Sequence, residues 1–569
     1  MTVATVSQSE SAAAGPVLTG QNRIRLLGLI FSCVFLAIAT KLVVTLAIAP
    51  VSEPPKEVAA AAGRIPRPDI VDRNGNVLAT DVAVASLYAD PRKILDIDEA
   101  VELITAALPD IDAKTLDTRL RQPGRAFIWL KRQVSPEERD AVFNLGIPGV
   151  AYVNERRRVY PQGRLAAQTL GYVDVDNKGI AGIERYLDDA GAIYTASLLE
   201  PGKDKAAPAE LALDIRVQHA LTDELQLAMT KFRAIAAGGI VMNVETGEIV
   251  ALTSLPDYNP NAEEKKIGRD QQNRMLSGVY ELGSVIKAVT FSMAFDYGVV
   301  TMESKFDARN PLVIGSARIN DFHAERRILS LPEVFTYSSN IGTAKMALEV
   351  GVERHKAFLE RVGLLDKLTT EVPETARPLL PKRWGRLVSA TAAFGHGFAV
   401  QPLQGLTVVA GLLNGGKMLQ PTFLKRSKEE ADVLARQIVR EETSAQMREL
   451  FRLNATDGSA SKADVIGYRV GGKTGTAEKV VGGRYSAQKR LATFIGAFPM
   501  EKPKYALIVM LDEPQATPET FGFATSGWNA VPTAGKIIAR IAPILDIDPV
   551  FTDADREKLA KQAKEKKQG

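Results

Sequence analysis

Residues 239–253 read GIVMNVETGEIVALT, and they indicate the architecture of the larger part of this 569-residue chain. Two runs rich in β-branched and apolar residues flank the polar triplet 245–247, a pattern typical of a β-hairpin. Near the other end of the chain, residues 492–498 and 505–511 form a second pair of β-prone runs around a turn that contains proline. The two pairs predict an antiparallel sheet assembled from both ends of one domain.

Helical patterns accompany and separate these strand pairs. Residues 211–229 predict a lead-in segment followed by an amphipathic helix, and residues 531–544 predict a closing helix. A doubly wound parallel sheet would instead alternate strands and helices along the chain. We therefore expect an α+β fold in which an antiparallel sheet carries a helical insert.

The N-terminal segment predicts a membrane anchor. Residues 26–49 contain one charge, Lys41, among 24 residues, and about 20 apolar residues suffice to cross a bilayer. This run is longer than the apolar part of a signal peptide, about 7–15 residues, although residues 47–49 (Ala-Ile-Ala) also fit a cleavage site. Because two arginines precede the run, the positive-inside rule predicts that residues 1–25 are cytoplasmic and that the chain beyond is exported.

The exported part divides by composition. Residues 50–63 are rich in proline and alanine and predict a linker. Residues 64–205 mix short strands and helices without a recognisable catalytic constellation, so we expect a pedestal domain that binds partners. Residues 206–550 contain both strand pairs, and residues 551–569 are charged and lack periodicity, which predicts a disordered tail.

The composition excludes several classes of protein. A formal net charge of +4 on so long a chain does not indicate nucleic-acid binding, which is normally accompanied by a strongly basic domain. The one cysteine, Cys33, excludes an intramolecular disulfide and a cysteine-based zinc cluster. Four scattered histidines offer little for a metal site. We therefore expect a globular exported protein that needs no metal and no organic cofactor.

The candidate chemistry is a serine activated by lysine. No serine fits the Gly-x-Ser-x-Gly pattern of many hydrolases. A lysine three residues after a serine lies on the same face of a helix. Its ordinary pKa near 10.4 is too high for a base at neutral pH, but burial and a second positive charge lower it.

Three Ser-x-x-Lys matches occur, so the pattern alone is a weak signal. They are Ser284/Lys287, Ser459/Lys462 and Ser486/Lys489. The second and third lie in polar stretches that predict loops, whereas Ser284 begins an apolar helix that ends at Gly298. Backbone N–H groups at a helix start can stabilise an oxyanion. The structural alternative is that Ser284 merely caps this helix.

Two further motifs strengthen the case for Ser284. Residues 338–340 (Ser-Ser-Asn) are the one Ser-x-Asn in the chain, and residues 473–476 (Lys-Thr-Gly-Thr) contain the one Lys-Thr-Gly. A lysine in the second motif would supply the extra positive charge, and its glycine would let a ligand lie close to the strand. Taken singly, residues 338–340 also fit the polar start of a helix, and residues 473–476 also fit the solvated end of a strand.

Together and in this order, the three motifs resemble the penicillin-binding protein and serine β-lactamase superfamily. The resemblance implies an antiparallel sheet with helices on both faces plus a helical subdomain, preceded by one transmembrane helix and a mixed α/β pedestal. It also implies roles for individual residues. Ser284 would be the nucleophile, and Lys287 would be its general base. Ser338 would relay a proton to the leaving amine, and Asn340 would bind the substrate amide. The carboxylate would be held by Lys473, Thr474, Gly475 and Thr476, and the oxyanion by the backbone N–H groups of Ser284 and Thr476.

Other stretches resemble class B penicillin-binding proteins, notably PDIVDRNGNVLA (68–79) and GHGFAVQPLQ (395–404). Residues 130–142 (LKRQVSPEERDAV) are similar to the division-specific, FtsI-type members. Two departures are Leu282, where proline often precedes Gly-Ser, and Pro68, where glycine is usual. Neither departure removes a reacting group.

The resemblance implies a D,D-transpeptidase of the bacterial inner membrane that cross-links peptidoglycan stem peptides at the division septum. β-Lactams would inhibit it, and an FtsW-type glycan polymerase and other division proteins would be its partners. Four alternatives stay open at this point: an elongation-specific transpeptidase, a D,D-carboxypeptidase, a β-lactamase and an inactive division scaffold. In the two hydrolases, water would release the acyl group from Ser284.

Overall fold

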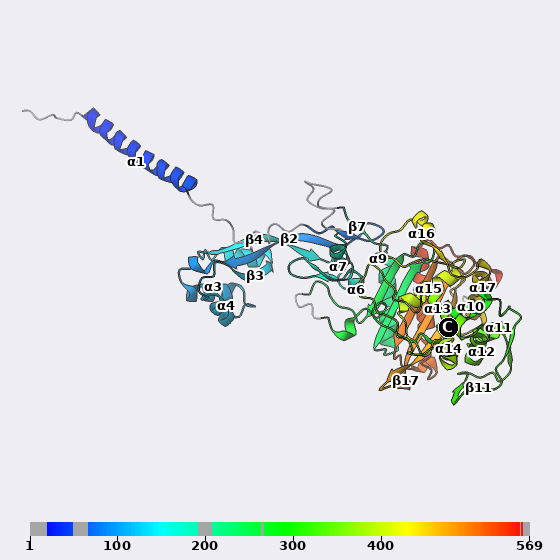
Figure 1. Ribbon diagram of the computed structural model, residues 1–569. Helices are drawn as coiled ribbons and strands as arrows, with labels where there is room; N and C mark the ends of the chain where they lie inside the picture. The colour runs from blue at the N-terminus through cyan, green and yellow to red at the C-terminus, as the bar shows by residue number, and fades with distance from the viewer. Residues whose placement is uncertain (1–19, 49–65, 192–206, 263–266, 558, 561–569) are drawn as a thin grey trace, which may run out of the picture.

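A computed structural model describes residues 20–48, 66–191, 207–262, 267–557 and 559–560. Its first element, α1 (Gly20–Ile48), is drawn apart from the other helices and strands in Figure 1. Within it, Asn22–Val44 has a mean hydropathy of 2.4 and no buried residue, so it is long and apolar enough to span a bilayer. Cys33 lies exposed on this helix. The expected linker, 50–63, lies outside the described residues.

The pedestal is built around one long strand, β2 (Val77–Ala89). It pairs antiparallel with β3 (Ile128–Val134) and β4 (Val150–Val159). The helices beside this sheet are α3 (Ile97–Ala107), α4 (Ala113–Leu120) and α5 (Pro136–Phe143), and their apolar faces share one core with β2 and β3. Helix α5 begins with a capping box between Ser135 and Glu138, and Pro136 is its first residue.

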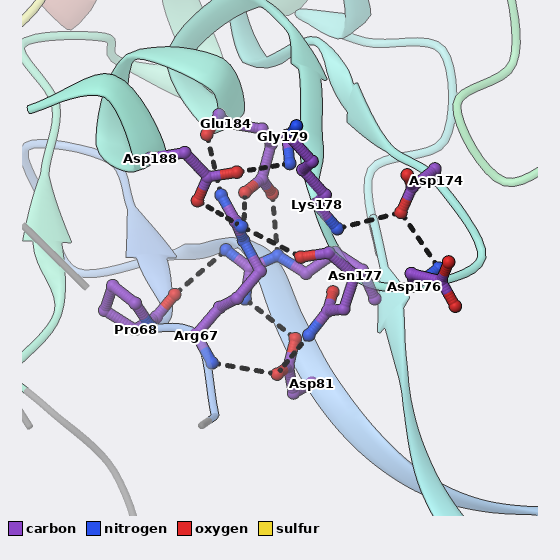
Figure 2. Close-up of polar contacts among 11 residues, drawn as sticks. Arg67, Pro68, Asp81, Asp174, Asp176, Asn177, Lys178, Gly179, Glu184 and Asp188 are labelled. Carbon is purple, nitrogen blue, oxygen red and sulfur yellow. Dashed lines mark hydrogen bonds and ion pairs between the residues drawn. The ribbon is translucent and has the colours of Figure 1, made fainter. Parts of the chain in front are cut away.

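A buried ionic network joins the N-terminal end of the pedestal, at Arg67, to its last helix, α7 (Gly182–Asp189). Glu184 accepts hydrogen bonds from Arg67 over 2.8 Å and from Arg158 over 2.7 Å. Arg158 also donates to Asp81 over 3.1 Å, and Arg67 donates to Asp188 over 2.7 Å (Figure 2). The side chains of Arg67, Glu184 and Arg158 are all at most 2% exposed. Each buried charge is therefore met by an opposite charge, as burial requires.

The inner part of the pedestal contacts the larger domain directly. Tyr258 donates to the carbonyl of Ala167, in α6 (Ala167–Leu170), over 2.8 Å. Gln168 donates to the carbonyl of Gln271 over 2.7 Å. Leu170 and Ile183 belong to the same apolar cluster as residues of the larger domain. The two parts thus share a core at this junction.

The larger domain holds the predicted antiparallel sheet. Its strands lie in the order β16-β17-β18-β8-β9, and every neighbouring pair is antiparallel. The central contact pairs β18 with β8, for example Ile508 with Ile240, and so joins the two ends of the domain as expected. The strand bounds are Ala236–Asn243 (β8), Ile249–Leu255 (β9), Gly471–Val481 (β16), Arg484–Phe498 (β17) and Tyr505–Asp512 (β18).

Helices cover both faces of this sheet, which confirms the fold that the resemblance implied. Alternate residues of a strand point to opposite faces, and Ile240 and Val241 accordingly lie in two different apolar clusters. One cluster includes α9 (Ile215–Lys231) and α18 (Ala530–Ile544). The other includes α10 (Lys287–Asp296), α15 (Pro402–Leu413) and α17 (Glu441–Asp457). Both faces are therefore covered by packed helices, and strands β8 and β18 are buried at all but one residue each.

Helices supply most of the regular secondary structure of the insert between β9 and β16, as predicted (Figure 1). Besides the helices already given, it contains α11 (Leu331–Thr336), α12 (Asn340–Val350), α13 (Val352–Arg361) and α14 (Arg386–Ala392). Short two-stranded ladders also occur, among them β11 (Leu312–Ile314) with β12 (Ala317–Ile319). The helical subdomain packs against α10 and so lies next to Ser284.

Two expectations are wrong. Ser486, predicted in a loop, lies in β17, where it pairs with Lys479; a long two-stranded extension carries its polar sequence out of the core. Within the predicted disordered tail, residues 553–557 are helical, whereas residues 561–569 lie outside the described residues. Thr552 caps this helix, because its hydroxyl accepts a hydrogen bond from the Asp555 N–H over 3.2 Å while the Asp555 carboxylate accepts from Thr552. Charge composition alone does not reveal this cap.

Candidate active site

Ser284 lies in a single 3₁₀ turn, η3 (Gly283–Ile286), that continues into α10. Neither segment has a side-chain cap, so the helix-cap alternative for Ser284 is wrong. Gly283 has φ +58°, and a Cβ on Gly395 would lie 2.2 Å from the Gly283 carbonyl oxygen. Two glycines thus permit the tight turn that presents the Ser284 hydroxyl to a cavity.

Two buried lysines converge on one hydroxyl, that of Ser338. Lys287 Nζ and Lys473 Nζ each donate to Ser338 Oγ over 3.0 Å. Lys287 also donates to the Ser338 carbonyl. Both lysine side chains are fully buried. Ser338 itself has φ +58°, a backbone conformation unusual for a residue with a side chain, and it lies between α11 and α12.

The direct contact between Ser284 and Lys287 that helical spacing predicts is not formed, and Lys287 contacts Ser338 instead. Among the described residues, no hydrogen bond joins Ser284 Oγ to Lys287 Nζ. Lys287 Nζ instead donates to the carbonyl and to the hydroxyl of Ser338, in the helical subdomain. Catalytic hydrogen bonds often form fully only when substrate is bound. The lack of a Ser284–Lys287 hydrogen bond is therefore compatible with Lys287 acting as the base.

The electrostatics of the two lysines follow from their burial. Burial lowers the pKa of Lys287 well below its ordinary value, and the nearby charge of Lys473 lowers it further. Burial lowers the pKa of Lys473 to about 7. The sequence prediction of a second positive charge beside the general base therefore agrees with the arrangement. The lowered pKa of Lys287 favours its neutral amine, which can accept a proton.

The Ser-Ser-Asn motif combines structural and cavity-facing roles. Ser339 caps α12 through the Gly342 N–H over 3.0 Å and donates to Asp321 over 2.8 Å. Asn340 donates to the Asn320 carbonyl over 3.0 Å, and its side chain lines the cavity. The polar-helix-start alternative thus holds for Ser339, while the residues on either side of it face the cavity.

Strand β16 presents alternate residues to the cavity, namely Thr474, Thr476 and Glu478. Gly475 lies between them, and a Cβ there would come within 2.5 Å of the Leu282 carbonyl oxygen. The turn that carries Ser284 therefore fills the space that a side chain at position 475 would need. The expectation that Gly475 makes room for a ligand is wrong, because the glycine lets β16 pack against η3.

The cavity has a volume of about 920 Å³ and brings together residues from all three motifs. Lys287, Lys473 and Gly475 lie buried behind its surface. The predicted site residues on its wall are Ser284, Ser338, Asn340, Thr474 and Thr476. Sequence reasoning missed other wall residues that are far apart in the chain, and these are Asp321, His396, Ser459, Lys462 and Trp528. Ser459 and Lys462 had a sequence signal, the second Ser-x-x-Lys match, which was assigned to a loop, and His396 lies within the stretch 395–404 quoted for the resemblance.

The described part of the chain contains no group of three or more His, Cys, Asp or Glu side chains that could hold a metal ion. His355 belongs to the core, where its ring lies 2.7 Å from Ser389 Oγ and burial lowers its pKa to about 4. The need for no cofactor stays a prediction. The arrangement around Ser284 is one that can perform acyl transfer with protein groups.

Comparisons with known proteins agree with this chemistry. Residues 237–538 match the model of the penicillin binding protein transpeptidase domain, and residues 64–190 match that of the penicillin-binding protein dimerisation domain. The chain is 41% identical over 490 residues to the probable peptidoglycan D,D-transpeptidase FtsI of Caulobacter vibrioides, covering 84% of this chain and 82% of that protein. It is 30% identical over 516 residues to the peptidoglycan D,D-transpeptidase FtsI of Escherichia coli K12, covering 86% of each.

A solved structure shows the same fold. The crystal structure of a peptidoglycan synthetase from Bifidobacterium adolescentis superposes with a TM-score of 0.67 at 21% identity, covering 86% of this chain and 97% of that one. The likeness therefore extends through the pedestal and the larger domain together.

Proposed function

The chain belongs to the family of penicillin-binding protein transpeptidases, and from this premise we propose that it is an FtsI-type peptidoglycan D,D-transpeptidase whose acyl-enzyme forms on Ser284. The observation that carries the proposal is the convergence of Lys287 and Lys473 on Ser338 Oγ beside Ser284 in one cavity. This arrangement supplies a nucleophile, a base of lowered pKa and a hydroxyl between them.

The first half-reaction acylates the enzyme. Ser284 Oγ attacks the carbonyl carbon of the D-Ala–D-Ala amide and gives its proton to Lys287. The backbone N–H groups of Ser284 and Thr476 stabilise the oxyanion. Ser338, bonded to Lys287 over 3.0 Å, passes a proton to the leaving nitrogen. The C–N bond breaks, D-Ala leaves with its new proton, and an ester remains on Ser284.

The second half-reaction transfers the acyl group to a neighbouring stem peptide. The acceptor amine attacks the ester carbonyl and loses a proton to the same relay, and the Ser284 hydroxyl is regenerated. During the preceding acylation, Asn340 holds the donor amide through its side chain, and Thr474 and Thr476 bind the terminal carboxylate until D-Ala leaves. The product is a new peptide bond between two stem peptides, and no oxidant or external energy source is needed.

The membrane helix supports a location at the inner membrane. Residues 1–25 would lie in the cytoplasm and the catalytic domain in the periplasm, because arginines precede the apolar run. The names of the FtsI relatives support a role at the division septum. An FtsW-type glycan polymerase would contact the pedestal and α1, with other division proteins nearby. β-Lactams would acylate Ser284, because their strained amide is attacked in the same way as D-Ala–D-Ala.

Product analysis separates a transpeptidase from a hydrolase. The full-length protein in detergent is incubated with a donor ending in D-Ala–D-Ala and a stem peptide that carries a free side-chain amine. We expect a cross-linked product in wild type and none in Ser284→Ala. Release of D-Ala with only hydrolysed donor would instead assign a carboxypeptidase.

Fluorescent fusions of the protein distinguish septal from lateral-wall localisation, and hence a role in division from a role in elongation.

A further inference from the structure

The second Ser-x-x-Lys match lies on the wall of the catalytic cavity. Ser459 and Lys462 are both exposed, and both line the cavity that contains Ser284. The residues between α17 and β16 that carry them include one 3₁₀ turn, η4 (Ser461–Ala463). The proposed mechanism gives neither side chain a role. Their position nevertheless puts a hydroxyl and a cation beside the substrate.

Ser459 is fixed against the substrate-binding strand. Its Oγ lies 2.7 Å from Thr474 Oγ1. Asn454, a fully buried residue of α17, anchors this contact from both sides. The Asn454 side chain donates to the Gly472 carbonyl of β16 over 2.7 Å and accepts from the Ser459 N–H over 3.2 Å. The loop and the strand therefore hold a defined geometry at the Thr474 end of the cavity.

Lys462 presents a positive charge at the same end. Its Nζ lies 3.1 Å from the centroid of the Trp528 ring, and that ring stacks on Phe523 with centroids 5.6 Å apart. A cation–π contact orients an ammonium group without neutralising its charge. Within the described residues, Lys462 forms no ion pair with an acidic side chain. Its charge is thus available to a ligand.

The other cations of the site are less suited to bind a carboxylate at this end. Lys473 is fully buried and donates to Ser338, and with a pKa of about 7 it is only partly charged at neutral pH. Arg318 lies on β12 in the helical subdomain. Arg490 is paired across the sheet with Glu478, farther along β16 than Thr474. Lys462 is the cavity-lining cation that follows Ser459 by three residues, and the Ser459 hydroxyl contacts Thr474.

We propose that Lys462 binds the C-terminal carboxylate of the donor stem peptide next to Thr474, and that Ser459 positions the Thr474 hydroxyl for the same carboxylate. The inference rests on the proposed function, since this carboxylate belongs to the D-Ala residue that leaves. Substrate binding displaces water from the cavity, which strengthens attraction between the ammonium and the carboxylate. Lys462 is therefore a specificity residue for donors that end in a free acid.

The test compares two donors of one sequence, which end in D-Ala–D-Ala as the free acid or as the C-terminal amide. Full-length wild type, Lys462→Gln and Lys462→Arg are assayed for release of D-Ala or D-alaninamide, and kcat and KM are determined separately. The matched control is Lys536→Gln, an exposed lysine of α18 that lines the neighbouring groove by Trp528 and not the catalytic cavity. Ser284→Ala reports background release.

We expect Lys462→Gln to lower kcat/KM for the acid about three- to tenfold, mainly through KM, because it removes one ionic contact. The amide donor should change less than about twofold, Lys462→Arg should retain most activity on the acid, and Lys536→Gln should match wild type on both. Unchanged activity of Lys462→Gln on the acid, or equal losses on both donors, would overturn this inference alone. Equal release by wild type and Ser284→Ala would overturn the proposed function, and this inference with it.

Discussion

Lys473 Nζ donates a hydrogen bond to Ser338 Oγ over 3.0 Å. Lys287 donates to the same oxygen over the same distance. A serine hydroxyl accepts two hydrogen bonds and donates one, so both lone pairs are occupied and the Ser338 proton is directed elsewhere. Since Ser338 lines the cavity, that proton is free to meet the nitrogen of a leaving group.

Replacing Ser338 by alanine should therefore slow acylation of Ser284 strongly. The change removes the proton relay and leaves two buried amines without their shared acceptor. We expect the acylation rate with benzylpenicillin to fall about 10²- to 10⁴-fold, the range for loss of a general acid–base group. Ser486→Ala serves as the control because Ser486 lies in β17 and outside the cavity lining. A rate for Ser338→Ala close to that of Ser486→Ala would contradict the relay.

The pH dependence of acylation should report the charge of Lys473. Acylation requires neutral Lys287, so the rate should rise as pH increases through the pKa of Lys287. Burial is the main cause of that lowered pKa, and Lys473 adds to it. In Lys473→Gln the added contribution disappears, and the pKa of Lys287 rises. We expect the rising limb of the rate profile, measured by stopped flow, to move to higher pH in this variant. A limb that stays in place, or moves to lower pH, would exclude this coupling.

The turn at Ser284 should not tolerate a side chain on Gly395. A Cβ there would meet the Gly283 carbonyl at 2.2 Å, and Gly395 has φ +82°. Because the displaced turn carries the nucleophile, we expect Gly395→Ala to slow acylation about 10- to 100-fold. Gly385→Ala is the control, since a Cβ at Gly385 would meet nothing within 4 Å. Equal rates in the two variants would show that the turn adjusts freely.

Breaking the buried ionic network should destabilise the pedestal. Glu184→Gln leaves Arg67 and Arg158 without one of their charge partners, and removing one member of a buried pair costs about 3–5 kcal/mol. Hydrogen exchange of amides in β2 and β4 measures the opening free energy of the pedestal directly. The control Asp189→Asn alters an exposed helical pair with Arg185, which contributes about 0.3–0.5 kcal/mol. Similar protection in both variants would be inconsistent with the network as a main stabilising feature.

The sheet was predictable because its signal is local. Each strand pair is close in sequence and carries its own turn, so residues 239–253 indicate a hairpin without any long-range information. The pairing of Ile240 with Ile508 follows once two apolar pairs must share one core. Ser486 was misplaced because polar residues in a long exposed strand have the composition of a loop.

The site was predictable only in part, because motifs name residues but not the contacts between them. Ser284, Ser338 and Thr474 lie on one cavity as the resemblance implied. The contact of Lys287 with Ser338 could not be predicted, since it joins residues 51 apart in the sequence and involves a left-handed backbone at Ser338. The Ser459 contact was also hidden, because it depends on Asn454 anchoring a loop to β16.

The identity of the nucleophile is the central claim, and peptide mass spectrometry after benzylpenicillin treatment tests it most directly. The full-length protein is trapped with the drug and digested, and the modified residue is located by fragmentation. We predict one stable penicilloyl adduct on Ser284 in wild type and none in Ser284→Ala. An adduct on a peptide that lacks Ser284, or an unmodified wild-type protein, would contradict the account.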